Sequence, residues 1–249
     1  MFLLFHLLTG LVIGYLLADR FDDRRIVLPC MLGAILPDLV DKPLGYLVLG
    51  DQIGNGRIFF HTLLFLVLLS AVGALFLRTR YTMLVPALAI GVGSHQVLDL
   101  MWEQPQEWLY PFLGPFSRLG NEDWFVHALF QELQNPAEWV SGMLLCLALL
   151  PFILPSTCRR LDGRIVRTFR GLALFAVPVL AVLGLFIVSQ GLLARFTPVT
   201  GWTEPLYNVL GGVVVILAAL AVYRLSRRGV SYEPPGKETR PATTLTPER

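Results

Sequence analysis

The chain begins with MFLLFHLLTGLVIGYLLA, residues 1–18, a run without any Asp, Glu, Lys or Arg. Its length matches the roughly 20 apolar residues that a helix needs to cross the hydrocarbon core of a bilayer. Backbone polar groups have no water partners there, so a run of this kind is expected to form a helix. No positive residue precedes the apolar part, which favours a retained first span over a cleaved signal peptide.

Six further apolar stretches follow along the chain. They comprise residues 26–50, 58–77, 82–101, 138–155, 171–194 and 203–223. Charged residues make up only 15% of the 249 residues, against roughly 25% in soluble domains. The mean hydropathy is +0.63. The sequence therefore predicts an all-α, multi-pass transmembrane bundle of about seven spans in the cell membrane.

The second stretch, 26–50, is irregular. It contains Pro37 and Pro43, with two glycines after them. Proline removes a backbone donor and bends or ends a helix. We therefore expect a span near 26–41, followed by a kinked or interfacial segment.

Lysine and arginine are distributed unequally between alternate connections. Sixteen of the 20 lie in residues 19–25, 78–81, 156–170 and 224–249. Only three lie in the other connections, 51–57, 102–137 and 195–202. The five tryptophans all lie in or beside this second set, as interfacial residues of one leaflet would. The positive-inside rule then predicts an outer N-terminus and a cytoplasmic C-terminus.

These patterns divide the chain into three regions. Residues 1–116 hold four expected spans. Nearly all of the ionisable residues that lie inside a span belong to these four. Residues 117–225 complete an acidic and aromatic interfacial connection and add three scaffolding spans. Residues 226–249 are polar and contain prolines, which predicts a disordered cytoplasmic tail.

Seven His, Asp and Lys side chains lie inside the first four apolar stretches, although a charge costs about 2.5–3.5 kcal/mol at the centre of a span. They are His6, Asp38, Asp41, Lys42, His61, His95 and Asp99. At a rise of 1.5 Å per residue, the histidines and Asp99 fall within roughly 10 Å of the outer boundary. The other two aspartates come from the outer half of the second span. Four spans thus bring imidazoles and carboxylates to one depth.

In the motif GSHQVLD, His95 and Asp99 are four residues apart, so both project from one helix face. Such a pair suits a divalent metal, and mixed imidazole and carboxylate ligands favour Zn²⁺, Mn²⁺ or Fe²⁺ over Ca²⁺. For any single histidine, a hydrogen-bonded contact between helices is the alternative. Asp41 and Lys42 equally suit a local charge pair. His127 is expected to be an ordinary interfacial residue.

The same residues lie in four short elements: His6, LPDLVD (36–41), GRIFFHT (56–62) and GSHQVLD (93–99). In this order they resemble the YdjM-like family of membrane-bound metal-dependent hydrolases. That family's pattern is an N-terminal His, a PD-x-D/H element, an HRG-x-TH-S element and a G-x-x-SH-x-x-x-D element. The resemblance covers roughly residues 1–116, with LYPFLGPF as its aromatic continuation. It implies hydrolytic activity with a similarity to zinc-dependent phospholipases C.

The residues that match this pattern are His6, Asp38, Arg57, His61, His95 and Asp99. Other positions depart from it. Gly56 stands where the family often has the first His of its HRG element. Ile58 and Phe60 replace the Gly and Thr of that element. Val40 stands at the usual second Asp, and Asp41 follows it directly.

The leading hypothesis is a metal-dependent hydrolase with its site at the outer leaflet. Its expected ligands are His6, Asp38, His61, His95 and Asp99, with one position open to water and substrate. Asp41 is the expected general base. Arg57, at the mouth of the site, suits a phosphate or carboxylate group. We expect a divalent metal (zinc first, manganese or iron as alternatives), a lipid or lipid-linked substrate from the bilayer, and no nucleic-acid partner.

Other classes of function remain open. A transporter or channel would also place charges in broken helices, although the last three spans carry almost no intramembrane charge. A haem protein would use histidines facing one another across helices, but the neighbouring aspartates argue against it. A non-catalytic membrane protein with a structural polar cluster is the third alternative.

Overall fold

The computed structural model describes residues 3–77, 83–118, 130, 133–153, 163–195 and 204–227. Every regular element in these residues is helical, as the sequence predicts. The long helices are α1 (Leu3–Phe21), α2 (Val27–Pro43), α3 (Leu63–Phe76), α4 (Leu84–Leu98), α7 (Pro136–Ile153), α9 (Gly163–Leu192) and α10 (Pro205–Arg227). The short elements are η1 (Arg24–Ile26), η2 (Leu44–Val48), η3 (Met101–Glu103) and α5 (Pro105–Trp108).

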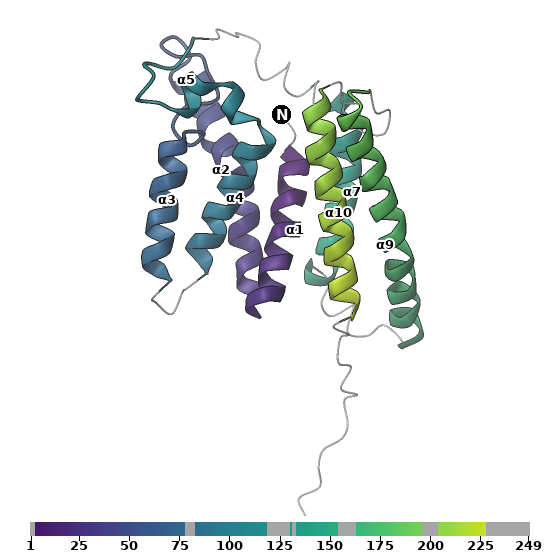
Figure 1. The fold of residues 1–249 in the computed structure, drawn as a ribbon. Coiled ribbons are helices and arrows are strands. Elements are labelled where there is room, and N and C mark those ends of the chain that lie inside the picture. Colours follow the sequence, from purple (N-terminus) through teal and green to yellow (C-terminus); the bar gives the residue numbers. More distant parts are fainter. Residues whose placement is uncertain are drawn as a thin grey trace, which may run out of the picture.

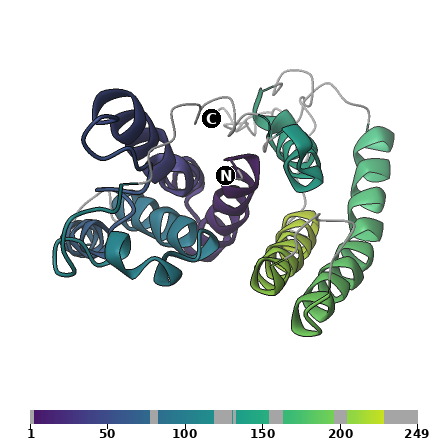
Figure 2. The ribbon, with the colours of Figure 1, turned by 90° about the horizontal axis from the view of Figure 1, so that it is seen from above.

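The long helices run side by side, and α1 lies between two groups of them (Figure 1, Figure 2). On one side α1 packs against α2, which packs against α4, and α4 packs against α3. On the other side α1 contacts α7 and α10, and α10 pairs with α9. Buried apolar residues line the contacts of α1, among them Leu8, Leu11, Val12, Val27, Met31, Leu145 and Ala221. The N-terminal helix thus joins both halves of the bundle.

The long helices in the described part of the chain follow the seven predicted stretches. By length and composition, three segments there could cross a membrane: Leu3–Phe21, Leu174–Leu192 and Pro205–Arg224. Leu63–Phe76 and Leu84–Leu98 are shorter apolar helices. The number of seven spans and their orientation stay predictions. Residues 226 and 227 of the expected tail are the last residues of α10, and the rest of the tail, from residue 228 onward, lies outside the described residues.

The start of α3 differs from the predicted stretch. α3 begins at Leu63 and not at residue 58, because backbone N–H groups of the preceding turn donate to the Asp41 carboxylate and hold that turn out of helical geometry. Thr62 then caps the helix, since its hydroxyl accepts a hydrogen bond from a backbone N–H of the first turn at 3.1 Å. His61 therefore lies in the turn before α3, and not four residues into a span.

Glycines allow α2 and α4 to approach closely. A Cβ at Gly33 would overlap the carbonyl oxygen of Leu88 in α4, and one at Gly91 would overlap the carbonyl oxygen of Cys30 in α2. Helices in lipid have no hydrophobic driving force toward one another, so small residues at the contact are what permits tight packing. This contact sets the distance between the site residues that the two helices carry.

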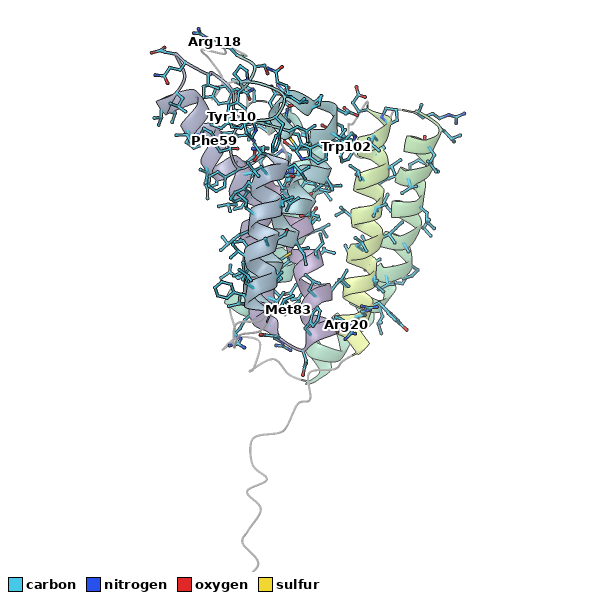
Figure 3. All side chains as sticks on the ribbon, turned by 60° about the vertical axis from the view of Figure 1, so that its left-hand side comes forward. Arg20, Phe59, Met83, Trp102, Tyr110 and Arg118 are labelled. Carbon is cyan, nitrogen blue, oxygen red and sulfur yellow. The ribbon has the colours of Figure 1, made fainter. Side chains whose placement is uncertain are left out.

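One end of the bundle carries the connections that the sequence predicts to be outside. Figure 3 labels at this end Phe59, Trp102, Tyr110 and Arg118. Arg20 and Met83 lie at the opposite end. Leu100, in the left-handed conformation with φ 51°, follows the C-cap of α4 and turns the chain into η3 and α5. The basic connection after α1 and the aromatic one after α4 are therefore at opposite ends, as the predicted alternation requires.

Candidate metal centre

Four buried side chains meet near the end of the bundle that holds α5. Asp38 comes from α2, His61 from the turn before α3, and His95 and Asp99 from the last turn and the C-terminal cap of α4. None is more than 8% exposed. One potential ligand atom from each lies within 4.8 Å of those of the other three. The predicted convergence of these four residues, here called the metal group, is confirmed.

The backbone of α2 fixes the orientation of His95. The ring Nδ1 lies 2.8 Å from the carbonyl oxygen of Ala34. Because a carbonyl oxygen can only accept, the neutral His95 ring carries its proton on Nδ1 and keeps the lone pair of Nε2. Pro37 has no N–H, so α2 makes one helical hydrogen bond fewer in the turn that His95 reaches.

Asp41 fixes the orientation of His61. The ring Nδ1 lies 2.8 Å from Asp41 Oδ2. The same oxygen accepts from the backbone N–H groups of Ile58, Phe60 and His61 itself at 2.8–3.2 Å. Since the carboxylate accepts, a neutral His61 ring carries its proton on Nδ1 and keeps the lone pair of Nε2. Histidines that bind metals typically donate their second nitrogen in this way.

The two lone pairs face each other. His95 Nε2 lies 3.2 Å from His61 Nε2. Asp38 Oδ1, which is buried and makes no hydrogen bond, lies 3.4 Å from His61 Nε2. Asp99 Oδ2 lies 3.9 Å from both ring nitrogens. With these tautomers all four atoms are acceptors, and buried acceptors are unfavourable unless a proton or a cation lies between them. The chemistry of this donor set fits a metal ion.

The separations within the metal group suit one small divalent cation. Tetrahedral ligands 2.0–2.2 Å from a metal lie about 3.3–3.6 Å from one another. Of the six pairs of ligand atoms, the five that include a histidine lie 3.2 to 3.9 Å apart, and all six lie within 4.8 Å. A haem would need its two imidazoles on opposite faces of a macrocycle, and the 3.2 Å between His61 and His95 leaves no room for one.

His6 lies beside the metal group and not within it. Its Nε2 lies 3.3 Å from Asp99 Oδ1, whereas His61 and His95 face the other oxygen of this carboxylate. The His6 ring also packs against the ring of His95, with centroids 4.3 Å apart. Through these contacts His6 touches two members of the group, and its role as a fifth ligand stays a prediction. His127, the fourth histidine, lies outside the described residues.

Two cationic side chains hold the carboxylates. Lys42 forms an ion pair with Asp38 Oδ2, which leaves Oδ1 to face the ring nitrogens. Arg57 Nε and Nη2 each lie 3.1 Å from Asp99 Oδ2, and Nη1 donates to Gln104 at 3.0 Å. Burial lowers the pKa of the Arg57 guanidinium, but Asp99, with smaller contributions from Asp38 and Tyr207, more than reverses this effect, so the pKa is raised and the group stays charged. Three buried aspartates thus face two cations, which favours a further cation.

A polar contact and an aromatic cluster lie at the same end of the bundle. The amide of Asn55 donates to the buried Glu107 at 3.3 Å and to the backbone after α5 at 2.9 Å. The aromatic cluster consists of Phe59, Tyr110 and Phe116, whose ring centroids lie 4.0–6.1 Å apart. These contacts bind the connection that precedes α3 to the segment that follows α5. They therefore join the two connections that border Arg57 and the metal group.

Two residues beyond residue 116 lie near the site, although no pattern in the sequence predicts this position. Glu138 of α7 accepts hydrogen bonds from the first turn of α1. Tyr207 of α10 interacts electrostatically with Asp99 and Arg57. In the sequence, Glu138 resembles an ordinary boundary residue of a span, and Tyr207 resembles an apolar residue of one. Only the packing of α1 against α7 and α10 reveals their position.

Comparison with known families agrees with this arrangement. The sequence matches the family model of the YdjM inner membrane protein over residues 1–191. The chain belongs to the YdjM family of inner membrane proteins. The match extends from α1 almost to the end of α9 and includes the whole metal group of this YdjM family member. Its apolar helices are consistent with this location in the inner membrane. No curated protein and no solved structure matches the chain.

Proposed function

We propose that this YdjM family protein is a metal-dependent hydrolase whose site opens at the non-cytoplasmic leaflet. The observation that carries the proposal is the metal group, in which the Nε2 atoms of two imidazoles converge with two carboxylate oxygens while each ring directs its Nδ1 at another acceptor. A divalent cation bound there would polarise a phosphate or ester oxygen and lower the pKa of a bound water to about 7, so that attack at neutral pH needs no separate base.

The four residues of the metal group would hold the cation. Each of them has a neighbour that engages its remaining polar atom. For Asp38, His61, His95 and Asp99 the neighbours are, in this order, Lys42, Asp41, the Ala34 carbonyl and His6. Arg57 contacts the other oxygen of Asp99, the one that faces the two imidazoles. Ligands that are oriented in advance lose little freedom when the cation binds, and such neighbours typically raise metal affinity 10–100-fold.

Asp41 has a positioning role in this proposal. A general base must reach the proton that it removes, directly or through one water. Both carboxylate oxygens of Asp41 accept hydrogen bonds from the turn before α3, and the residue is 0% exposed. We therefore assign it to orienting His61, in place of the general-base role that the sequence suggests.

Arg57 is the side chain best placed to bind an anionic substrate. It is 31% exposed. Three of the five N–H groups of a guanidinium are directed at Asp99 and Gln104 here, which leaves two for a substrate oxygen. The planar guanidinium suits a phosphate or carboxylate group. Phe112, 77% exposed in the segment that forms the aromatic cluster, supports a substrate with an apolar part. A phospholipid or a lipid-linked phosphate or ester combines both features.

Metal content and hydrolysis, measured on the same detergent-purified samples, test the proposal. The samples are the wild type, Asp38→Asn, His95→Ala and, as a control, His127→Ala. The substrates are a chromogenic phosphodiester, a chromogenic carboxylic ester and short-chain phospholipids in mixed micelles. We expect about one metal ion per wild-type chain and metal-dependent hydrolysis, both lost in the first two variants and kept in the control.

Two results would contradict this proposal in different ways. Metal binding without hydrolysis of any of these substrates would keep the metal group but remove the hydrolase. A wild-type protein that takes up no Zn²⁺, Mn²⁺ or Fe²⁺ would remove the metal group as well.

A further inference from the structure

α1 begins against a buried carboxylate of α7. Glu138 is 3% exposed. Its Oε2 accepts from the backbone N–H of Leu4 at 2.8 Å, and its Oε1 accepts from that of Phe5 at 3.1 Å. The first N–H groups of a helix have no partner within the helix, and a carboxylate there also interacts favourably with the helix dipole. Glu138 thus caps α1 from a helix that is distant in the sequence.

The start of α7 is shaped for this contact. Gly142 lies one turn after Glu138, so the two residues share a helix face. A Cβ at Gly142 would lie only 2.9 Å from Leu4 Cδ1. The indole N–H of Trp139 donates to the carbonyl of Leu133 at 2.8 Å and ties the first turn of α7 to the segment before it. α7 therefore supplies a carboxylate that accepts from the backbone of Leu4, and a glycine that leaves room for the Leu4 side chain.

The turn that Glu138 caps also carries His6. The His6 Nε2 atom lies 3.3 Å from Asp99 Oδ1, and its ring packs on that of His95. Only one peptide unit separates this imidazole from the N–H of Phe5 that Glu138 accepts. Any displacement of the first turn of α1 therefore moves His6 relative to Asp99.

We propose that Glu138 is a positioning residue of the metal centre, because it holds the first turn of α1 where His6 can fix Asp99. This inference rests on the metal-dependent function proposed above. It gives the C-terminal helices a part in the site, since α7 supplies a side chain on which the ligand geometry depends. The role is separate from the apolar packing between α1 and α7.

A double-mutant cycle between Glu138 and His6 tests this role. The Zn²⁺ affinity of detergent-purified Glu138→Ala, His6→Ala and the double variant is measured by competition with a chromophoric chelator. We expect Glu138→Ala to bind Zn²⁺ about tenfold more weakly than the wild type, as for other residues that orient ligands. The double variant should bind no more weakly than His6→Ala, because Glu138 acts through His6. Glu138→Gln keeps one acceptor oxygen and should lose less.

Two further measurements separate positioning from general destabilisation. Asn208→Ala removes a buried polar side chain of α10 that lies near the Arg195 carbonyl, and it should leave the Zn²⁺ affinity unchanged. Hydrogen exchange of the amides of Leu4 and Phe5 should be faster in Glu138→Ala than in the wild type, with or without metal. This second readout reports the cap itself.

The possible outcomes distinguish the two proposals. If the wild type binds Zn²⁺ and Glu138→Ala binds it equally well, the positioning role is wrong and the proposed function stands. Additive losses in the double variant, or an equal loss in Asn208→Ala, also overturn the positioning role. If the wild type binds no Zn²⁺, the proposed function and this role fail together, even where hydrogen exchange shows that the cap exists.

Discussion

The Nε2 atoms of His61 and His95 lie 3.2 Å apart, while each ring donates its Nδ1 proton elsewhere, one to Asp41 and the other to the Ala34 carbonyl. Two neutral imidazoles in this arrangement have no proton to share. A cation between them would replace the repulsion of two lone pairs by two coordinate bonds. Binding and folding should therefore be linked.

The first prediction concerns this linkage. Addition of Zn²⁺ should raise the melting temperature of the chelator-treated wild type, because a ligand at 100 times its Kd contributes about 2.7 kcal/mol to the free energy of unfolding. His61→Ala should melt at the same temperature with and without Zn²⁺. Thermal unfolding in detergent measures both, with His127→Ala as the control that keeps the shift. An equal Zn²⁺-induced shift in His61→Ala would show that the ion binds elsewhere.

The second prediction concerns Asp41→Asn. The amide keeps the shape of the carboxylate but loses charge-assisted hydrogen bonds to the turn before α3 and to His61. We expect 10–100-fold weaker Zn²⁺ binding and a loss of about 1.5–3 kcal/mol in the free energy of unfolding. Zinc titration and thermal unfolding measure these effects, and Asp51→Asn, at an exposed position of the same connection, is the control. If Asp41→Asn instead retains full metal affinity and loses only hydrolysis, then Asp41 is the general base.

The third prediction compares two glycines of α4. A Cβ at Gly91 would overlap the backbone of α2, whereas one at Gly93 would make ordinary contacts of 3.7–3.8 Å with the side chain of Leu66. Gly91→Ala should therefore destabilise the protein by about 1–3 kcal/mol, as overpacking does. Gly93→Ala should be neutral or slightly stabilising, because alanine has the higher helix propensity. Thermal unfolding of both variants in one detergent measures the difference. Equal melting temperatures of the two variants would show that the contact between α2 and α4 is looser than described.

The fourth prediction concerns orientation. Gln52 and Arg24 are exposed and belong to connections at opposite ends of the bundle. In a background without the native cysteines, a membrane-impermeant maleimide added to spheroplasts should label Gln52→Cys. It should label Arg24→Cys only after the membrane is opened. The reverse pattern would invert the orientation and place the site at the cytoplasmic leaflet.

Much of the site follows from helical periodicity. His95 and Asp99 share a helix face because they are four residues apart, and this spacing needs no knowledge of tertiary structure. The depth of Asp38 follows in the same way once the spans are marked. Local spacing therefore predicts three members of the metal group.

The remaining features depend on tertiary contacts. Asp41 draws backbone N–H groups of the following turn to itself, so His61 precedes α3, although the apolar run predicts a helix there. The same contacts change the expected role of Asp41 from base to positioning residue. Glu138 is informative only when α7 is known to meet the start of α1. No periodic pattern reports the pairing of helices so distant in the sequence.

The ion pair between Asp38 and Lys42 also bears on how the protein enters the membrane. The two residues are one helical turn apart in α2, so a translocon receives a neutral pair in place of two separate charges. Asp41, in the same helix, receives all of its described hydrogen bonds from the turn before α3. Its charge is therefore compensated only when that turn has been synthesised. α2 and α3 are thus expected to partition into the bilayer as one unit, so that the residues of the metal group begin to assemble during biogenesis.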